Sequence, residues 1–427
     1  MLTLDISSAL AKAITPSMGI PDADMSALRT SMKKYVEDWL KERSRGEHAW
    51  SMDPYDKKAL QRVKEVAMSA KGRGIRTVLW VGIGGSGLGP KVIQEVFEGP
   101  ETMEFIVVDT IDPAALLQLL SMVEWKTTLL VIASKSGDTL EPMSAFFLLW
   151  EHLNTRSKVR AQDHVVAITD PEKGTLHDFC LLNDIPMLPL PPAVGGRYSI
   201  FTPIGLLAIA LLDGDLNAFV RGAKEMDTLC QHTSLNDNPA ALLAATQFLL
   251  DTRRGYSVRV IMPYSVRLQS LARWNQQLIA ESLGKTETSN PIPLAAIGTQ
   301  DQHSLLQQWM AGPRVCWHLF IRELEKPRLN VPENIDESWK YIGGKTFGQL
   351  LDACYEGTAR ALTGAKRPHV TIALTRLDAA HLGQLLYLLL AEVVFLGKLY
   401  RIDPYGQPAV EVGKQITKQL LSRGRLE

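Results

Sequence analysis

The sequence predicts an α/β protein built from two doubly wound, three-layer units, with helical segments at both ends of the chain. First, short apolar strands alternate with helix-type segments from residue 76 onward, which is the order found in βαβ units. Second, these strands are apolar along their length, as is typical of parallel strands buried on both faces. Third, the same alternation returns between residues 246 and 400.

The N-terminal segment, residues 1–72, is predicted to be helical. Apolar residues spaced among mixed charges indicate a helix over residues 26–41. A second helix is expected over residues 55–70, with Asp53 placed where a capping residue would stand. The N-terminus carries no basic leader before an apolar run, so no secretory signal is expected.

The two α/β units are expected over residues 73–245 and 246–400, with connecting helices over 195–250. The first unit predicts strands at 77–81, 105–108, 128–133 and 164–168, and helices at 90–97, 113–123 and 141–153. The second unit predicts strands at 257–262, 315–321 and 370–374, and helices at 268–283 and 383–396.

The longest apolar stretch, residues 385–396, is interrupted by Glu392 and is shorter than the roughly 18–20 residues that a membrane helix needs. It therefore predicts a buried helix. The last segment, residues 401–427, is a Pro/Gly turn followed by a basic helix.

Charge and cysteine content exclude several classes of protein. The 427 residues contain 46 basic and 46 acidic side chains, so no general attraction to nucleic acid or to an acidic membrane is expected. The four cysteines form no CxxC pair, which excludes a dense disulfide framework and the common zinc spacings. Reduced thiols in the cytoplasm are the expectation, and no histidine pattern indicates a metal site.

A glycine-rich loop, Gly82 to Gly87, follows the first strand of the first unit and allows two interpretations. It matches GxGxxG, and Asp109 ends the next strand, about where a dinucleotide fold places its ribose-binding acid. Alternatively, the loop binds the phosphate of a small ligand, with Gly85 allowing close backbone approach and Ser86 donating from its hydroxyl.

A second polar loop, residues 134–139, favours the phosphate interpretation, because a dinucleotide fold does not need it and a phosphosugar site does. It lies after the third strand, at the start of a helix. Asp138 is unexpected here, since an anion beside a phosphate is costly unless its side chain points outward. The candidate donors are Ser134, Lys135, Ser136 and Thr139.

The two loops give the chain a resemblance to the phosphoglucose isomerase family. VGIGGSGLGP and SKSGDTLEP are similar to two of its signature segments. Four more segments follow in the family's order, so that the resemblance runs from about residue 78 to residue 415: VGGRYSIFTPIGL (194–206), QLIAESLGK (277–285), GTQDQHS (298–304) and QPAVEVGK (407–414).

This resemblance implies two sugar-isomerase (SIS) domains and the interconversion of glucose 6-phosphate and fructose 6-phosphate in glycolysis and gluconeogenesis. The family reaction opens the sugar ring and passes through an enediolate, without a metal or redox cofactor. The resemblance also implies a homodimer with a shared active site. After Lys285, residues 286–291 replace the glycine-rich continuation common in the family, so a different local loop is expected there.

The family's catalytic roles fall on four residues of this chain. By resemblance, Glu281 moves the proton between C1 and C2, and Arg197 stabilises the enediolate. His303 opens the ring and enters from the partner subunit, while Lys414 contacts the sugar near its ring oxygen. The resemblance therefore implies that the C-terminal turn and helix, residues 401–427, pack back on the active site. The substrate-contacting positions correspond to Gly85, Ser86, Ser134, Lys135, Ser136, Thr139, Gln277 and Gln407.

Two alternatives remain open at the level of sequence. One is a phosphosugar-binding SIS protein that senses a metabolite without catalysis, which would need both phosphate loops but not Glu281, Arg197 and His303 together. The other is an NAD-dependent dehydrogenase built on the GxGxxG turn.

Overall fold

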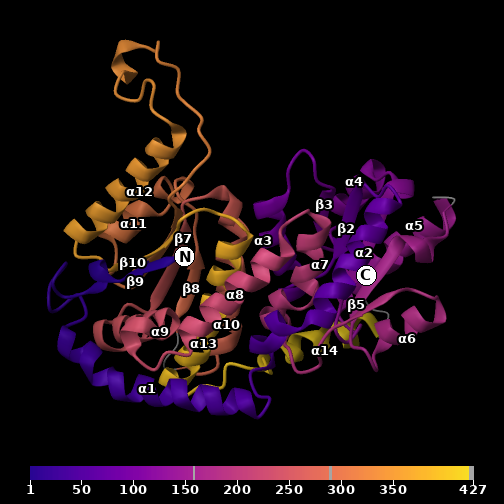
Figure 1. The fold of residues 1–427 in the computed structure, drawn as a ribbon, viewed down its shortest axis with the longest axis horizontal. Helices are drawn as coiled ribbons and strands as arrows, with labels where there is room; N and C mark the ends of the chain where they lie inside the picture. The colour runs from indigo at the N-terminus through magenta and orange to yellow at the C-terminus, as the bar shows by residue number, and fades with distance from the viewer. Residues whose placement is uncertain (157–158, 288–290, 423–427) are drawn as a thin grey trace.

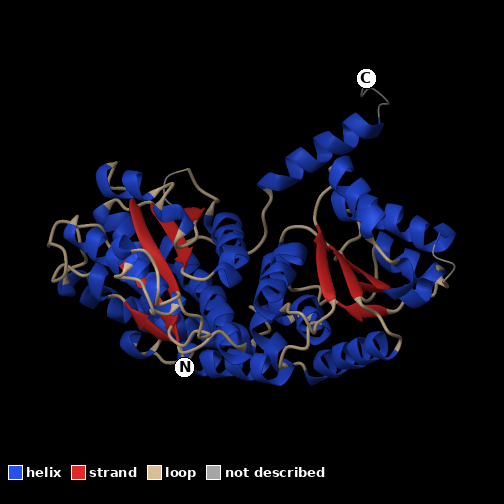
Figure 2. Ribbon diagram, turned by 90° about the horizontal axis from the view of Figure 1, so that it is seen from above, coloured by secondary structure: helices blue, strands red, loops and turns tan. Residues whose placement is uncertain are grey.

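A computed structural model describes residues 1–156, 159–287 and 291–422 of the chain. Within these residues, two five-stranded sheets lie side by side with helices around and between them (Figures 1 and 2). The predicted α/β class, with two doubly wound units of the SIS type, is confirmed. One correction concerns the N-terminal segment, which adds a strand to the second sheet.

The first sheet is wholly parallel, with the order β3-β2-β4-β5-β6. In β2, β4 and β5 every residue is buried, because helices cover both faces of the sheet, and this explains the apolar runs. Strand β6 was missed because it has three residues. The strands are β2 (Thr77–Val81), β3 (Glu104–Val108), β4 (Thr128–Ala133), β5 (Val165–Thr169) and β6 (Met187–Pro189).

The strand order reverses at β2, since β3 lies on one side of it and β4 on the other. In open α/β sheets, ligands bind in the crevice at the carboxyl ends of the strands beside such a reversal. Both polar loops noted in the sequence follow β2 and β4, so the sheet topology places them on the two sides of this crevice.

The helices of the first unit are α3 (Gly85–Phe97), α4 (Pro113–Met122), α5 (Leu140–Arg156) and α6 (Thr175–Leu182). Helix α3 begins at Gly85, five residues before the predicted start at Pro90. Pro90 has no N–H for the Ser86 carbonyl, and the Trp80 indole donates to that oxygen instead, at 2.9 Å. The proline therefore lies inside the helix without leaving an unpaired carbonyl at Ser86.

The second sheet contains four parallel strands in the order β10-β9-β7-β8, which repeats the reversal of the first sheet at β7. A fifth strand, β1 (Thr3–Asp5), pairs antiparallel with β10. The expectation of a wholly helical N-terminus was therefore wrong here, because three residues are too short to show a period of two. The parallel strands are β7 (Val258–Pro263), β8 (Ile292–Ala295), β9 (Cys316–Glu323) and β10 (His369–Leu374).

Two long helices, α1 (Asp22–Ser44) and α2 (Lys57–Gly72), lie within the predicted N-terminal helical segment. Asp56 caps α2 by accepting the N–H groups of Lys58 and Ala59, so the predicted cap at Asp53 was wrong by three residues. The remaining helices are α7 (Pro203–Leu211), α8 (Leu216–Cys230), α9 (Pro239–Arg254), α10 (Gln269–Leu283), α11 (Leu306–Ala311), α12 (Phe347–Gly364), α13 (Ala379–Tyr400) and α14 (Ala409–Ser422).

Helix α13 is long and apolar enough to cross a membrane by length and composition, but protein buries 94% of its apolar window. This confirms the predicted buried helix. Its Glu392 is fully buried and forms a two-bond ion pair with the equally buried Arg259, at 2.5 and 3.1 Å. The pair accounts for the one charged residue that interrupts the apolar run, since a buried carboxylate needs such a partner.

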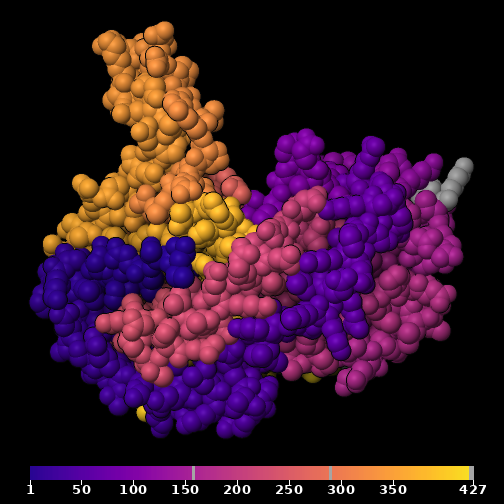
Figure 3. All heavy atoms as spheres, viewed as in Figure 1, coloured from indigo at the N-terminus to yellow at the C-terminus, as the bar shows by residue number. Residues whose placement is uncertain are grey.

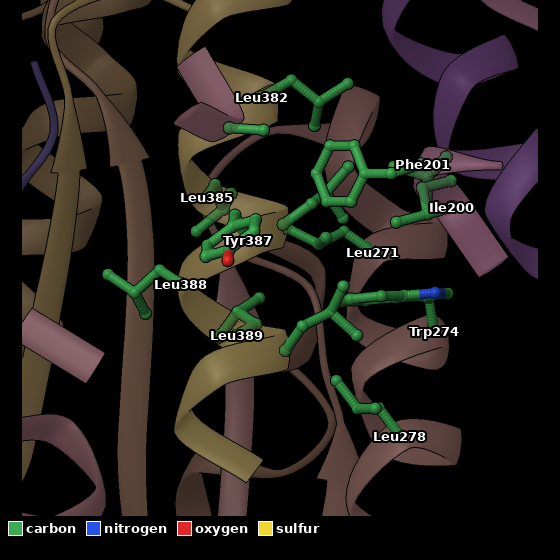
Figure 4. Close-up of a cluster of buried hydrophobic side chains, with 14 of the residues drawn as sticks. Ile200, Phe201, Leu271, Trp274, Leu278, Leu382, Leu385, Tyr387, Leu388 and Leu389 are labelled. Carbon is green, nitrogen blue, oxygen red and sulfur yellow. The ribbon is translucent and has the colours of Figure 1, made fainter. Parts of the chain in front are cut away.

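One hydrophobic cluster joins the elements that lead into the candidate site (Figure 4). Ile200 and Phe201 contribute from the 3-10 helix Gly196–Phe201, and Leu271 and Trp274 contribute from α10. Leucines of α13, among them Leu385, complete it. Because interiors are close-packed, this shared cluster fixes the three elements relative to one another.

Two segments stand out from the body of the molecule. The arm, residues 324–346, projects above the second sheet (Figures 1 and 3) and exposes the stacked rings of Trp339 and Tyr341. Helix α14 projects from the body in Figure 2, and none of its residues is buried. In the single chain, the predicted packing of the C-terminal helix back on the active site is therefore not observed, although the turn before it does pack there.

His318, in β9, generates a prediction about acid stability. Its ring is fully buried between Trp309 and Phe320, and neither ring nitrogen has a hydrogen-bond partner in the described residues. Burial lowers the pKa of His318 from 6.5 to about 3. Between these values the unfolded chain binds a proton that the folded chain does not, so stability is lost as the pH falls.

We expect the free energy of unfolding of the parent protein to fall as the pH is lowered from 6.5 towards 4, measured by urea denaturation. His318→Leu should make this fall shallower without abolishing it, because burial also lowers the pKa of His369, to about 4. The matched control, His232→Leu at an exposed position, should leave the slope unchanged. Equal slopes for the parent and His318→Leu would contradict the assignment.

Candidate active site

Four segments that are far apart in the sequence meet at the reversal of the first sheet. They are the glycine-rich loop after β2, the 3-10 helix Gly196–Phe201, the last turns of α10, and the turn between α13 and α14. Helix α10 follows β7 of the second sheet and packs against α3 of the first. One helix of the second unit therefore brings its side chains to the ligand crevice of the first.

Arg197 lies at the centre of this junction, with only 3% of its side chain exposed. Its Nε donates to the Ser282 hydroxyl at 2.8 Å. Its Nη1 donates to the Glu281 carboxylate at 3.2 Å and to the amide oxygen of Gln407 at 2.8 Å. The fixed fork of the guanidinium thus joins the end of α10 to the start of the C-terminal segment.

The remaining nitrogen of the guanidinium, Nη2, binds backbone carbonyl groups. It donates to the carbonyl oxygens of Pro404 and Gly406, at 2.7 and 3.0 Å. The Tyr198 hydroxyl adds a bond to the Pro404 carbonyl at 3.1 Å. Every N–H of the Arg197 guanidinium therefore has an acceptor, and its plane has a single orientation in this structure.

Glu281 has a hydrogen-bond donor on each carboxylate oxygen. Gln277, one helical turn earlier on α10, donates to Oε1 at 2.9 Å, and Arg197 donates to Oε2. The Glu281 side chain is 29% exposed, so solvent and small molecules can reach it. A positioned, accessible carboxylate next to a fixed cation is an arrangement suited to moving a proton beside a carbonyl group.

The turn that carries the Pro404 and Gly406 carbonyls is held from two directions. We call residues 403–406 the strap. Lys285 donates to the Asp403 carbonyl at 2.5 Å and to the Tyr405 carbonyl, so that consecutive strap carbonyls point alternately to Lys285 and Arg197. Burial lowers the pKa of Lys285, Asp403 opposes this, and the positive charge of Arg197 lowers it further.

The glycine-rich loop packs against the Arg197 segment. A Cβ atom on Gly85 would lie 2.1 Å from the Gly196 carbonyl carbon and 2.5 Å from the Arg197 nitrogen. The glycine therefore permits a close approach of the protein's own backbone. Asp109 in turn pairs with Lys91 at 2.6 Å. The glycine-rich loop and Asp109, on which the dinucleotide interpretation rested, are therefore both engaged in contacts within the protein. These contacts argue against the dinucleotide interpretation.

In the second loop, residues 134–139, hydroxyl oxygens stabilise the turn. The Ser134 Oγ accepts from the Gly137 N–H and the Ser136 Oγ from the Asp138 N–H, both at 3.2 Å. Neither hydroxyl donates a hydrogen bond within the described residues; Ser136 is exposed, whereas Ser134 is buried. The Asp138 carboxylate accepts from the Thr175 hydroxyl at 2.8 Å, at the start of α6. This contact holds the anion at a helix N-terminus, where negative charge is favourable.

Lys135 is placed differently from the free phosphate-binding ammonium expected from the sequence. Its Nζ donates to the carbonyl oxygens of Pro192 and of Val194, the latter at 3.3 Å, and burial lowers its pKa. Lys135 therefore joins the second loop to the backbone that leads into Gly196 and Arg197.

Sequence reasoning named Arg197, Glu281, Gln277 and Gln407, and the structure brings these four together. It does not bring His303 and Lys414 to them within the single chain. His303 is exposed after β8, and Lys414 is exposed on α14, where it pairs with Glu411 at 2.7 Å. Ser86 and Thr139 are half-buried in the two loops that flank the crevice.

Three residues of the junction were not singled out from the sequence: Ser282, Tyr198 and Lys285. Each stands within a segment that carried the family resemblance, directly beside or a few residues after a named residue, and that adjacency was the available signal. The altered loop after Lys285 lies partly outside the described residues, since 288–290 are not described.

Comparisons with known proteins agree with one another. The family model described as phosphoglucose isomerase matches residues 56–426. A glucose-6-phosphate isomerase of Rubrobacter xylanophilus is 36% identical, over 87% of this chain and 88% of its own. One of Carboxydothermus hydrogenoformans is 31% identical, over 95% and 92%.

Among solved structures, a hypothetical protein of Thermus thermophilus has a TM-score of 0.89 with 29% identity, over 99% of this chain and 100% of its own. A glucose-6-phosphate isomerase of Chlamydia trachomatis has a TM-score of 0.78 with 23% identity, over 92% of this chain and 79% of its own. At 23% identity, the similarity to the Chlamydia trachomatis structure shows a shared fold and no more.

The contact between Gly85 and Gly196 generates a stability prediction. Gly85→Ala forces the two backbones apart, and overpacking of this kind costs about 1–3 kcal/mol of unfolding free energy. Gly99→Ala is the matched control, since a Cβ there meets nothing within 4 Å. Urea denaturation of both variants checks the prediction, and equal unfolding free energies would show that the contact is not tight.

Proposed function

The chain belongs to the phosphoglucose isomerase family, and from this premise we propose that it interconverts glucose 6-phosphate and fructose 6-phosphate, a step of glycolysis and gluconeogenesis. The observation that carries the proposal is the contact between the buried Arg197 guanidinium and the accessible Glu281 carboxylate, beside a crevice flanked by two phosphate-type loops. The substrate phosphate is assigned to these loops, with Ser86, Ser134, Ser136 and Thr139 as donors.

In the proposed mechanism, the Glu281 carboxylate removes the proton from C2 of the open aldose and returns it to C1. The electron pair left behind forms an enediolate, whose negative O1 lies beside Arg197. A proton passes from the C2 hydroxyl to O1, and return of the carbon-bound proton to C1 then leaves the carbonyl group at C2. The guanidinium is already held by Ser282 and the strap, so it needs little reorganisation when the charge develops. Gln277 and Gln407 are assigned to substrate hydroxyl groups.

Ring opening requires an acid and a base at the ring oxygen and the C1 hydroxyl, and we assign these tasks to His303 and Lys414. Both are exposed in the single chain, away from Arg197 and Glu281. We propose that a second copy of the chain supplies His303, in a homodimer with shared sites. Exposed apolar side chains on the arm and on α14, such as Tyr341 and Ile416, support an interface between copies.

We also propose that the reaction takes place in the cytoplasm. Cys180, Cys230, Cys316 and Cys354 are all unpaired, and free thiols are characteristic of proteins in a reducing compartment.

The proposed reaction is tested by incubating the purified chain with fructose 6-phosphate and measuring glucose 6-phosphate. We expect product from the parent chain, and a kcat about 10²–10⁴-fold lower for Glu281→Gln, because the amide cannot accept the proton. Glu287→Gln is the control, as a glutamate of the loop that follows α10.

Equal activity of the parent and Glu281→Gln would assign proton transfer to another group. No product from either chain, together with measurable binding of the sugar phosphate, would favour the non-catalytic sensor.

The shared site predicts complementation between two inactive variants. In a mixed dimer of Glu281→Gln and His303→Ala chains, one site carries both defects and the other carries neither. Unfolding and refolding the two variants together should therefore restore activity that neither recovers alone. If each site is built from one chain, the mixture stays inactive.

A further inference from the structure

We propose that Lys285 is a positioning residue for isomerisation: it holds the strap so that Arg197 and Gln407 are fixed relative to Glu281. The inference rests on the proposed function and extends it to a residue outside the assigned catalytic and substrate-binding set.

The strap is bound through its backbone on alternate sides. The carbonyls of Asp403 and Tyr405 accept from Lys285, while those of Pro404 and Gly406 accept from Arg197. Two cations thus share four consecutive carbonyl groups. If Lys285 no longer holds its two carbonyls, the strap loses the restraint opposite to Arg197.

Besides the bond from Tyr198 to the Pro404 carbonyl, the strap has an anchor in its own side chain, the hydroxyl group of Tyr405. It accepts from the Trp50 indole at 3.0 Å and lies 2.5 Å from Nδ1 of His48, whose Nε2 contacts Glu42 at 2.8 Å. This series of hydrogen bonds connects the strap to Glu42 of α1.

Space is available for the strap to move. A cavity of about 620 Å³ is lined by Asp403, Pro404 and Tyr405 together with His48 and Arg401. Packing is therefore incomplete on this side of the strap, where the hydrogen bonds of Lys285 and Tyr405 oppose those of Arg197.

Displacement of the strap would reach the reacting groups directly. Gln407 follows Gly406 in the chain and accepts from the same Arg197 nitrogen that contacts Glu281. A misplacement of about 1 Å in a catalytic constellation can cost about 10²-fold in rate. The substrate phosphate is assigned to other loops, so substrate affinity should depend much less on the strap.

The test compares kcat and KM for fructose 6-phosphate in the parent, Lys285→Met and Lys285→Arg. We expect Lys285→Met to lower kcat about 10–100-fold with KM changed less than about threefold, because the strap moves while the phosphate loops stay. Lys285→Arg retains donors for both carbonyls and should recover most of kcat. Lys71→Met, at a surface lysine of α2, is the matched control and should match the parent.

A second variant keeps the test independent of how Lys285→Met folds. Tyr405→Phe removes the other anchor and should lower kcat with the same small change in KM. Because both side chains act on one strap, the double variant should lose less than the product of the two single losses.

The outcomes separate the inference from the proposed function. An inactive parent would overturn the proposed function itself. An active parent with an unchanged kcat in Lys285→Met, an effect confined to KM, or no rescue by Lys285→Arg would overturn the role of Lys285. Fully multiplicative losses in the double variant would show that Lys285 and Tyr405 act independently, against a shared strap.

Discussion

The junction between the two units depends on the guanidinium group of Arg197. It is almost completely buried, and a charge in that position is tolerable only when its hydrogen bonds are satisfied. Its acceptors come from the end of α10, the strap and Gln407. The requirement to satisfy one cation therefore brings together segments that are separated by more than two hundred residues of chain.

Hydrophobic packing supports this polar junction without taking part in it. Ile200 and Phe201 follow Arg197 within one short helix, Trp274 precedes Glu281 on α10, and the leucines of α13 precede the strap. All of them belong to the cluster in Figure 4. The hydrogen bonds thus determine how the side chains are oriented at the crevice. The close-packed cluster beneath them determines how far apart the helices that carry these side chains lie.

Most of the fold could be predicted from the sequence because parallel strands that are buried on both faces are apolar along their length. β2 and β4 were predicted to the residue. Shorter strands, such as β1 and β6, carry too few residues for a pattern, and their pairing is decided by neighbours far along the chain. Helix α12 was missed although a capping box, Thr346 with Gln349, marks its start.

In the site, side chains were predictable and backbone groups were not. The family resemblance led to Arg197 and Glu281, but a carbonyl group has the same chemistry at every position, so the acceptors on the strap left no signal in the sequence. The placement of Lys135 on such carbonyls was hidden for the same reason. His303 and Lys414 were named by the same resemblance, but in the single chain both are exposed and do not join Arg197 and Glu281.

The strand β1 has a consequence for the order in which the chain can become structured. Its residues pair with β10, so that Leu4 lies opposite Ile372, and the second sheet is closed by two segments at opposite ends of the sequence. The first sheet, from Thr77 to Pro189, is by contrast contiguous. During synthesis from the N-terminus, the first sheet can form while β1 still lacks its partner β10. In the sequence, β1 precedes the strands of the first sheet and β10 follows them. Contacts of such long sequence separation are slow to form, so the earliest residues made are among the last to find their place.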